Sequence, residues 1–411
     1  MRISTNFFRK KGWQRSLINE DTIRKKQFLL CCGAFIANGM LALSTGSLLP
    51  FLREANGLDY AFCGLIVSLH SVGNLISGFF AGTLAMMIGR KKSILLFETF
   101  FPISVILMLS GSRPLLAFAF LATGLARGAC SNYCNVKINS IAPGIAWVLN
   151  CLHACFAVGA FVFPLVLMLF TKANNEYWVY ACWFLTAVGV ISWFLYFIIP
   201  EDEDKKSDKD ETDAKKRVRE TLGFFQEPMF YMCTATLFFY LCAETGVIGW
   251  MITYFKDTGL LDPNLSQVTA SILWIMILAG RLTVAWLSTK YRKENLLPAM
   301  GIGIVVFFMV LIISKTTVPI IIGIMGFGFS MAGIYATTVS FAGEIIKKYN
   351  LAWSFTLTIA SLGSIIMPAI IGLIADNYGI SLGISSIAVA LFIDMVCIMK
   401  LVSHVKNKVP V

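Results

Sequence analysis

Charged residues are scarce in this sequence. Only 14% of its 411 residues are Asp, Glu, Lys or Arg, whereas a soluble protein carries about 25%. Hydrophobic residues make up 57% of the chain, and they form runs of about 20 residues separated by short polar breaks. No soluble core buries so many segments that are apolar on every side. The sequence therefore predicts an all-α polytopic membrane protein.

The sequence also lacks the motifs of catalysis and cofactor binding. It contains no nucleophile with a paired base, no metal-binding motif and no phosphate-binding glycine loop, so we expect neither an enzyme nor a cofactor. Its eleven cysteines are scattered rather than spaced as a disulfide framework. Cys151, His153 and Cys155 are close enough in sequence for a soft-metal site, but small apolar membrane thiols are the simpler interpretation.

Basic residues outnumber acidic ones, 34 to 23, yet no soluble face presents them to a nucleic acid. They lie in short loops, where they set the orientation of the spans. The two tails and the loops on their side hold 27 Lys and Arg, and the opposite loops hold five. This bias predicts that both termini are cytoplasmic, in a protein of the plasma membrane. The expected surroundings are the lipid bilayer, with no nucleic-acid partner.

Twelve runs are long enough to cross a bilayer. The predicted spans lie near residues 28–51, 60–84, 93–112, 114–139, 145–170, 177–199, 228–255, 266–288, 296–313, 318–346, 351–374 and 381–403. The tenth span, 318–346, is overlong, so we expect its ends to tilt or to protrude from the membrane.

A highly charged stretch divides the spans six and six. Residues 201–220 contain nine acids, seven bases and almost no apolar side chain, so this stretch is predicted to be a solvated linker. The predicted parts are a cytoplasmic tail (1–27), an N-terminal six-helix bundle (28–199), a cytoplasmic charged linker (200–227), a C-terminal six-helix bundle (228–403) and a second cytoplasmic tail (404–411).

The two predicted bundles share sequence features at a nearly constant offset. Gly159 and Pro164 of the fifth span recur as Gly363 and Pro368 of the eleventh, 204 residues later. Because six spans separate the two halves, both run in the same direction through the membrane. Such a parallel repeat predicts two bundles related by a pseudo-two-fold axis along the membrane normal, which is typical of secondary transporters.

The loop after the second span resembles a signature of the major facilitator superfamily. Residues 82–92 read G-T-L-A-M-M-I-G-R-K-K, and the superfamily pattern is G-x-L-x-D-R-x-G-R-K. Met86 and Met87 stand where the pattern has aspartate and arginine, so the aspartate that makes a gating ion pair in the superfamily is missing. The resemblance extends over all twelve spans and the central linker. It implies two six-helix bundles, a monomer, and transport by alternating access.

Four segments are similar to the fucose and glucose/galactose permease group of this superfamily. They are Leu149–Ala160, Ala243–Tyr254, Leu273–Leu282 and Gly372–Gly379. This resemblance implies proton-coupled uptake of a sugar or a similar small polar solute. The alternative is proton-coupled efflux of drugs or other amphiphilic compounds, because Arg127 is similar to the fourth-span arginine of drug/proton antiporters and the chain has 33 Phe and 17 Met.

A carboxylate lies in the middle of the seventh span. Residues 240–255 read Y-L-C-A-E-T-G-V-I-G-W-M-I-T-Y-F, and Glu244 would cost roughly 2.5 kcal/mol or more in lipid unless it faced protein or water. We therefore predict that this segment borders a cavity, where Glu244 takes up a proton or another coupling ion. His70 and His153 titrate near neutral pH and are predicted to act with it as proton-coupling residues.

The resemblance implies that spans one, four, seven and ten line this cavity. In span four, Arg127, Ser131 and Asn135 recur every four residues and therefore share one helix face. Arg127 either grips an anionic ligand or pairs with Glu244. The predicted residues that bind the small-molecule substrate are Asn38, Arg127, Asn132, Asn135, Asn150, Trp250, Tyr254, Trp274 and Tyr335.

Four further residues are predicted to form a gate near the cytoplasmic ends of the spans. They are Arg90, Lys91, Arg281 and Glu344, with Arg281 and Glu344 as partners.

Overall fold

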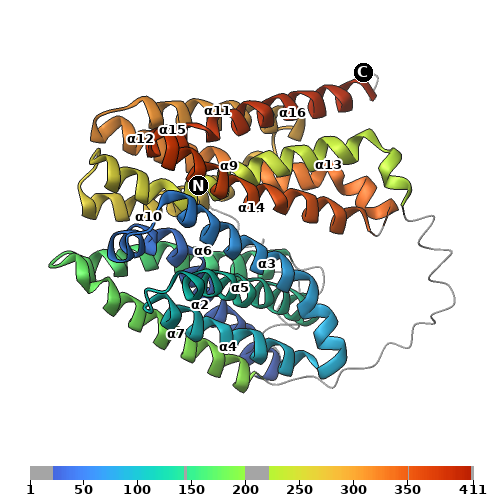
Figure 1. Cartoon of the computed structure of the whole chain (residues 1–411). Helices are drawn as coiled ribbons and strands as arrows, with labels where there is room; N and C mark the ends of the chain where they lie inside the picture. The colour runs from blue at the N-terminus through green and yellow to red at the C-terminus, as the bar shows by residue number, and fades with distance from the viewer. Residues whose placement is uncertain (1–21, 143–145, 200–221, 350, 409–411) are drawn as a thin grey trace, which may run out of the picture.

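The computed structural model describes residues 22–142, 146–199, 222–349 and 351–408, and all the regular secondary structure in these ranges is helical. The N-terminal bundle consists of α2 (Thr22–Asn56), α3 (Tyr60–Ile88), α4 (Arg90–Met108), α5 (Arg113–Ile141), α6 (Ala146–Thr171) and α7 (Trp178–Ile198), with the short η2 (Asn175–Tyr177) before α7. Figure 1 shows these helices as one layered group in the lower half of the molecule.

The C-terminal bundle repeats this arrangement. It consists of η4 (Gly223–Gln226), α9 (Pro228–Thr258), α10 (Pro263–Leu287), α11 (Lys293–Ile313), α12 (Thr317–Met331), α13 (Ile334–Lys348), α14 (Ala352–Tyr378), α15 (Ile380–Ser385) and α16 (Ile387–Lys408). Within the described residues, eleven helical stretches are long and apolar enough to cross a membrane. The 19-residue α4 completes the twelve spans. The prediction of twelve spans in two six-helix bundles is confirmed.

The helices differ from the predicted spans at four places, one of which is the predicted twelfth span, 381–403: it consists of two helices, α15 and α16, separated at Ser386. Helix α2 begins at Thr22 and α16 ends at Lys408, because helical geometry continues through the polar residues that flank each apolar run. The predicted tenth span is two helices, α12 and α13, separated at Ala332 and Gly333. Most of the predicted N-terminal tail and linker (residues 1–21 and 200–221) lies outside the described residues, as do residues 409–411, whereas residues 404–408 of the predicted C-terminal tail belong to α16.

The bundles meet through equivalent pairs of helices. Helix α3 packs on α14, α6 packs on α10, and α2 packs on α9. In span order these pairs are two with eleven, five with eight, and one with seven. If the two halves of the chain are exchanged, the pair of spans two and eleven becomes the pair of spans eight and five, and the pair of spans one and seven becomes itself. A pseudo-two-fold axis between the bundles imposes this relation.

Two glycines show that the repeat is also one of packing. A Cβ atom at Gly159 of α6 would overlap the carbonyl oxygen of Ile36 on α2, and a Cβ atom at Gly363 of α14 would overlap that of Phe238 on α9. Each glycine therefore allows the fifth helix of its bundle to touch the backbone of the first.

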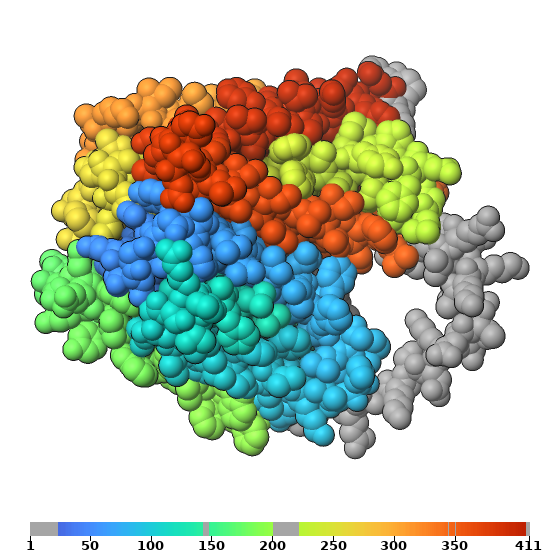
Figure 2. Space-filling view, in the orientation of Figure 1, coloured from blue at the N-terminus to red at the C-terminus, as the bar shows by residue number. Residues whose placement is uncertain are grey.

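The bundle ends are distinguished below by their place in the chain. We call the end where α7 stops and α9 starts the linker end, and the end where α2 and α9 stop the distal end. In Figures 1 and 2 the bundles lie against each other along α3 and α14 and diverge toward the linker end, at the right of both views.

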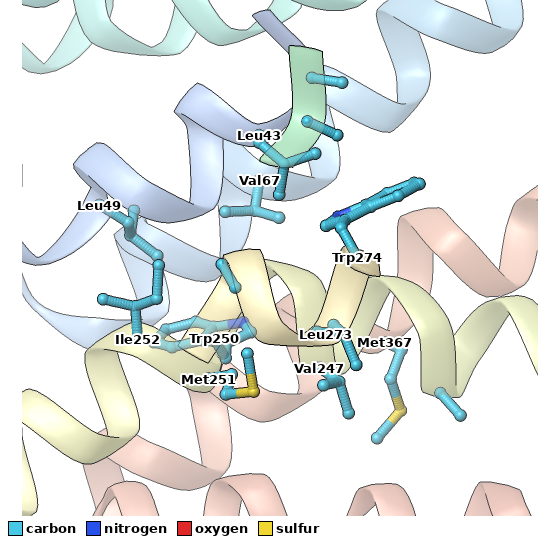
Figure 3. Close-up of a cluster of buried hydrophobic side chains, with 14 of the residues drawn as sticks. Leu43, Leu49, Val67, Val247, Trp250, Met251, Ile252, Leu273, Trp274 and Met367 are labelled. Atoms are coloured by element: carbon cyan, nitrogen blue, oxygen red, sulfur yellow. The ribbon is translucent and has the colours of Figure 1, made fainter. Parts of the chain in front are cut away.

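The contact between the bundles is apolar over much of its area. Leu43 and Leu49 of α2 and Val67 of α3 face Val247 and Ile252 of α9, and all five are buried (Figure 3). Gly46 of α2 lets this helix approach closely, since a Cβ atom there would overlap the carbonyl oxygen of Ile248. Packing of backbone and aliphatic side chains thus joins the bundles near the distal end.

The contact between α3 and α14 predicts a specific sensitivity to glycine replacement. A Cβ atom at Gly372 would overlap the carbonyl oxygen of Tyr60, and one at Gly64 would lie 2.5 Å from the carbonyl oxygen of Pro368. Backbone cannot move aside as a flexible side chain can. We expect Gly372→Ala to cost about 1–3 kcal/mol and to lower the melting temperature of the purified protein by several degrees.

Gly78→Ala is the matched control, because a Cβ atom at Gly78 meets no atom within 4 Å. It should leave the melting temperature unchanged or raise it slightly, since alanine favours a helix more than glycine does. Equal melting temperatures for the two variants would show that the close approach of α3 and α14 does not contribute to stability.

Candidate functional site

Polar residues from both bundles lie together near the middle of the spans, with Arg281 displaced toward the linker end of α10. We call this set the central cluster. It comprises Asn38 (α2), His70 (α3), Arg127 and Ser131 (α5), Tyr240 and Glu244 (α9), Trp274 and Arg281 (α10), and Tyr335 (α13). Arg127, Glu244 and Tyr335 keep partial exposure to solvent.

The contribution of the N-terminal bundle is a directed chain of hydrogen bonds. The Thr123 hydroxyl donates to the carbonyl oxygen of Phe120 over 2.6 Å, so its oxygen is free to accept from His70 Nδ1, which lies 2.7 Å away. Arg127 Nη1 lies 3.3 Å from His70 Nε2 and has only protons to donate. These directions require a neutral His70 with its proton on Nδ1, and that ring holds the Arg127 guanidinium in place.

The C-terminal bundle contributes the carboxylate. The Tyr240 hydroxyl, one helical turn before Glu244, donates to Glu244 Oε1 over 3.2 Å. The Tyr335 ring packs against the Tyr240 ring with centroids 6.3 Å apart, and it interacts electrostatically with Glu244. Tyr335 is the second residue of α13, so the interruption between α12 and α13 lies beside the carboxylate. Helices interrupted within the membrane commonly border transport sites.

Two guanidinium groups act electrostatically on this carboxylate. Arg281 of α10 and Arg127 of α5 each interact electrostatically with Glu244, one from each bundle. Neither has a carboxylate oxygen within 4.0 Å in the described residues. Of the two alternatives for Arg127, a close ion pair with Glu244 is therefore not what the structure shows. The Arg281 charge also reaches His153 of α6, across the contact between the bundles.

Several polar atoms in or beside the cluster are buried and have no hydrogen-bond partner among the described residues. Asn38 Nδ2 donates to Ser131 Oγ over 3.2 Å, but the buried Asn38 Oδ1 accepts from no described residue. Trp274 is 5% exposed and its Nε1 likewise has no described partner, while its ring lies 5.5 Å from the Phe156 ring. Asn135 Oδ1, one turn beyond Ser131, is a third such atom. Buried donors and acceptors without partners are costly, so these atoms are suited to binding a polar ligand.

Four other predicted substrate-binding residues lie elsewhere. Trp250 is fully buried between the bundles, and its Nε1 donates to the carbonyl oxygen of Pro368 over 3.3 Å. Figure 3 shows the Trp274 ring pointing away from it. Tyr254 is 2% exposed and packs on Phe255. Asn132 Nδ2 donates to the Gly78 carbonyl oxygen, which ties α5 to α3, and Asn150 is exposed on α6.

The remaining predictions concern His153 and the gate. His153 is half-buried and packs edge-on against Phe35 with centroids 5.6 Å apart. At the linker end, Arg90 is exposed at the start of α4 and Lys91 Nζ donates to the Ile199 carbonyl oxygen over 3.2 Å. Arg281 belongs to the central cluster instead. The side chain of Glu344, its predicted partner, lies outside the described residues.

A metal site at Cys151, His153 and Cys155 has no support in the structure. No group of three His, Cys, Asp or Glu side chains in the described parts of the chain is placed to hold a metal ion.

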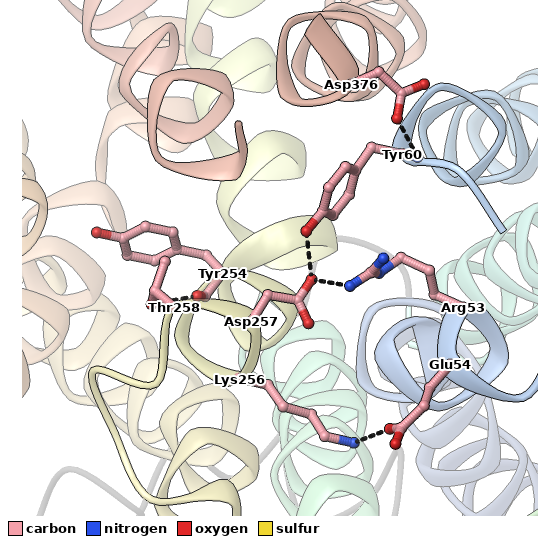
Figure 4. Close-up of polar contacts among 8 residues, drawn as sticks. All are labelled: Arg53, Glu54, Tyr60, Tyr254, Lys256, Asp257, Thr258 and Asp376. Carbon is pink, nitrogen blue, oxygen red and sulfur yellow. Dashed lines mark hydrogen bonds and ion pairs between the residues drawn. The ribbon is translucent and has the colours of Figure 1, made fainter. Parts of the chain in front are cut away.

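A second polar network joins the bundles at the distal end. Arg53 Nη2 donates to Asp257 Oδ2 over 2.7 Å, and the Tyr60 hydroxyl donates to the same oxygen over 2.9 Å (Figure 4). Lys256 Nζ pairs with Glu54 Oε2 at 3.2 Å. Arg53, Glu54 and Tyr60 belong to the N-terminal bundle, so both ion pairs cross between the bundles.

Asp376 adds a helix cap that also crosses this contact. Its Oδ1 accepts from the Tyr60 backbone N–H over 2.7 Å and its Oδ2 from the Ala61 N–H over 3.0 Å. These are the first two N–H groups of α3, which have no acceptor within the helix, and a carboxylate there also favours the helix dipole. The end of α14 thus holds the start of α3.

Asp59, the residue before α3, also caps this helix, but unlike Asp376 it makes its contacts within the N-terminal bundle. Asp59 accepts from the Phe62 backbone N–H over 2.6 Å and pairs with Arg113 of α5 at 2.9 Å. The Phe62 hydrogen bond, ahead of the Arg113 charge, holds the pKa of Asp59 below its ordinary value although burial opposes the shift.

The distal network was absent from the sequence prediction, although the sequence contains a signal for it. Arg53-Glu54 and Lys256-Asp257 are adjacent charged pairs about 204 residues apart, the offset of the repeat. A pseudo-two-fold axis that passes between the first and seventh spans brings equivalent positions together. The basic residue of each charged pair then meets the acidic residue of the other pair, Arg53 with Asp257 and Lys256 with Glu54. Tyr240 was missed as well, and its position four residues before Glu244 could have identified it.

Comparisons with known proteins agree with this architecture. Residues 30–355 match the family model described as Major Facilitator Superfamily. The glucose/mannose transporter GlcP of Bacillus subtilis (strain 168) is 23% identical over 354 residues, which cover 82% of this chain and 85% of GlcP.

Two solved structures have the same fold at low sequence identity. A D-xylose–proton symporter superposes with a TM-score of 0.76 and 14% identity, covering 92% of this chain and 97% of the symporter. The nucleoside transporter NupG gives a TM-score of 0.74 and 12% identity, covering 93% of this chain and 99% of NupG.

Two six-helix bundles that share a polar cluster at mid-span define a multi-pass membrane transporter rather than an enzyme. Together with the match to the family model, these features show that the chain belongs to the major facilitator superfamily.

The distal network predicts that Asp257 helps to hold the bundles together. Asp257→Asn removes the negative charge that Arg53 and Tyr60 share, and hydrogen bonds to charged groups contribute about 1.5–3 kcal/mol each. We expect the variant to populate a state with a wider distal end about tenfold more than the parent. The population of this state is measured from the distance between two electron-spin labels, one at Ala55 and one at Lys315. The labels are introduced as unnatural amino acids, so that the eleven native cysteines stay in place.

Arg113→Gln is the matched control, because it removes an ion pair of similar length that lies within the N-terminal bundle. Its distance distribution should equal that of the parent. If Asp257→Asn gave the same distribution as Arg113→Gln, the distal network would have no part in the equilibrium between states.

Proposed function

We propose that this protein is a secondary active transporter that takes up a sugar or a similar small polar solute together with protons. The central cluster is the substrate site in this proposal, and Glu244 is the residue that carries the proton. The observation that supports it best is the placement of one carboxylate among residues of both bundles, at mid-span, with partial exposure.

Glu244 suits a proton-carrying role because of what faces it. The titratable or charged groups around it are Tyr240 on its own helix, Tyr335 on α13, Arg281 on α10 and Arg127 on α5. Both arginines carry fixed charges at physiological pH. A neutral His70 bonded at both nitrogens is better suited to positioning Arg127 than to relaying protons.

Alternating access supplies the movement in this proposal. The bundles are joined near the distal end by the Asp257 and Asp376 contacts and by close backbone packing, whereas they diverge at the linker end (Figure 2). We assign this arrangement to a state open to the linker side. Breaking the distal contacts and closing the linker end would expose the central cluster to the other side.

The relatives support uptake of a polar solute over efflux of amphiphiles. One is named as a glucose/mannose transporter, and a protein of the same fold is named as a D-xylose–proton symporter. Asparagine, tyrosine, serine and tryptophan in the cluster can hydrogen-bond to sugar hydroxyls.

The remaining predictions become part of the same proposal. We place the linker end in the cytoplasm, with both termini there, because 27 Lys and Arg lie on that side against five on the other. We further propose a monomer in the plasma membrane, with bundle limits near residues 28–199 and 228–403.

The proposal predicts the effect of neutralising Glu244. The protein would be reconstituted into liposomes that enclose a pH-sensitive dye, and D-glucose, D-mannose, D-xylose and D-glucuronate would be added outside in turn. We expect at least one sugar to drive proton entry in the parent. Glu244→Gln cannot lose a proton, so it should abolish proton entry and accumulation while sugar exchange continues.

Glu98→Gln is the matched control, because Glu98 is a buried carboxylate whose described partner is the Ser192 hydroxyl of the same bundle. It should keep proton-coupled accumulation. The coupling role of Glu244 would be refuted by a Glu244→Gln variant that still concentrates sugar against its gradient, and the uptake proposal by a parent protein that moves none of the four sugars.

A further inference from the structure

The fixed charges of the central cluster are unequal in sign. Arg127 and Arg281 each carry a positive charge, and among the described side chains Glu244 is the one carboxylate with which both interact. His70 is neutral in its hydrogen-bond chain. With Glu244 ionised the cluster therefore carries one excess positive charge, and with Glu244 protonated it carries two.

The two guanidinium groups also have unused hydrogen-bonding capacity. A guanidinium has five N–H donors, and the one hydrogen bond of Arg127 to a described residue goes to His70, with the Phe156 ring 5.9 Å from its central carbon. Arg281 is exposed and makes no hydrogen bond or ion pair with the described residues. Arg127 lies in the middle of α5, and a permanent cation at that depth in a membrane protein is costly without an anion nearby.

Groups suited to hydroxyls adjoin the two cations. Trp274 Nε1 and Asn38 Oδ1 are buried and have no described partner, so they provide one donor and one acceptor. The Trp274 and Phe156 rings provide flat apolar surface against which a sugar ring can pack.

We propose that the substrate is an anionic sugar, a sugar acid with a single carboxylate, and that Arg127 and Arg281 bind this carboxylate from opposite bundles. The inference rests on the proposed function and narrows it to one substrate class. One carboxylate matches the single excess positive charge that remains when Glu244 is ionised, whereas a neutral sugar would leave that charge uncompensated. Guanidinium groups suit carboxylates because their paired N–H donors match the two oxygens.

The test compares two sugars that differ at one carbon atom. D-glucuronate has a carboxylate where D-glucose has a hydroxymethyl group, and both offer the same ring hydroxyls. Radiolabelled forms of each would be bound to the purified full-length protein. We expect the parent to bind D-glucuronate at least tenfold more tightly than D-glucose, and the difference to shrink as salt is added.

Variants of the two arginines then locate the carboxylate. Arg127→Gln and Arg281→Gln should each weaken D-glucuronate binding at least tenfold while changing D-glucose binding less than threefold. Arg127→Lys keeps the charge without the paired donors, so it should show an intermediate loss and also serves if Arg127→Gln fails to fold. Arg113→Gln, at an arginine outside the cluster, should bind both sugars as the parent does.

Three outcomes separate this inference from the proposed function. Equal binding of both sugars, or D-glucuronate binding that neither arginine variant weakens, would overturn the anionic substrate. Proton entry driven by D-glucose but not by D-glucuronate in the liposome assay would also overturn it while leaving sugar uptake intact. Proton entry driven by D-glucuronate and lost in Arg127→Gln and Arg281→Gln would support both.

Discussion

A carboxylate deep in a membrane protein needs nearby positive charge, hydrogen-bond donors or water. Glu244 has all three kinds of support, from Tyr240 on its own helix, from Arg127 and Arg281 on two others, and from its partial exposure. Because the supporting residues come from both bundles, any relative movement of the bundles changes the surroundings of the carboxylate. In the proposed function, proton binding at Glu244 and the position of the bundles would therefore be energetically linked.

The pseudo-two-fold arrangement explains why the polar contacts lie where they do. An axis between the bundles brings the first and seventh spans face to face, so equivalent residues of the repeat meet across it. At the distal end these equivalents are Arg53-Glu54 and Lys256-Asp257, which pair in crossed order. Deeper in the membrane the equivalent surfaces have diverged, with Asn38 on α2 and Glu244 on α9. Symmetry thus explains the structural contact, and the departure from symmetry gives the site its charge.

The spans and the repeat could be predicted because each follows from a local signal. A run of about 20 apolar residues identifies a span, and a glycine-proline spacing repeated 204 residues later identifies the second half. The carboxylate of Glu244 was recognisable for the same reason, since its cost in lipid depends only on its place within the run.

The neighbours of each residue could not be predicted in the same way. Trp250 and Trp274 are the same residue type in adjacent spans, yet Trp250 donates to Pro368 within the packed contact, whereas Trp274 lies beside Phe156 and its Nε1 has no partner among the described residues. The interruption at Ala332 and Gly333 was read as excess length. The surroundings of the two tryptophans and the break in the tenth span depend on how each helix is rotated and on which helices lie next to it. The hydropathy of the sequence contains no information on either.

The two ends of the molecule hold the bundles by unequal means. At the distal end Asp376 of α14 caps the first two N–H groups of α3, an interaction that requires the bundles to be close there. At the linker end of the same helix α3, Met86 stands where the superfamily pattern has an aspartate, and it is 82% exposed and brings no charge.

A carboxylate at one end of α3 and a thioether at the other favour contact at the distal end. This bias would have to be overcome for the bundles to close at the linker end. An anionic substrate that offsets the excess positive charge of the central cluster would lower the electrostatic cost of enclosing it. Binding energy at the centre, rather than an ion pair at Met86, is then what stabilises the closed linker end.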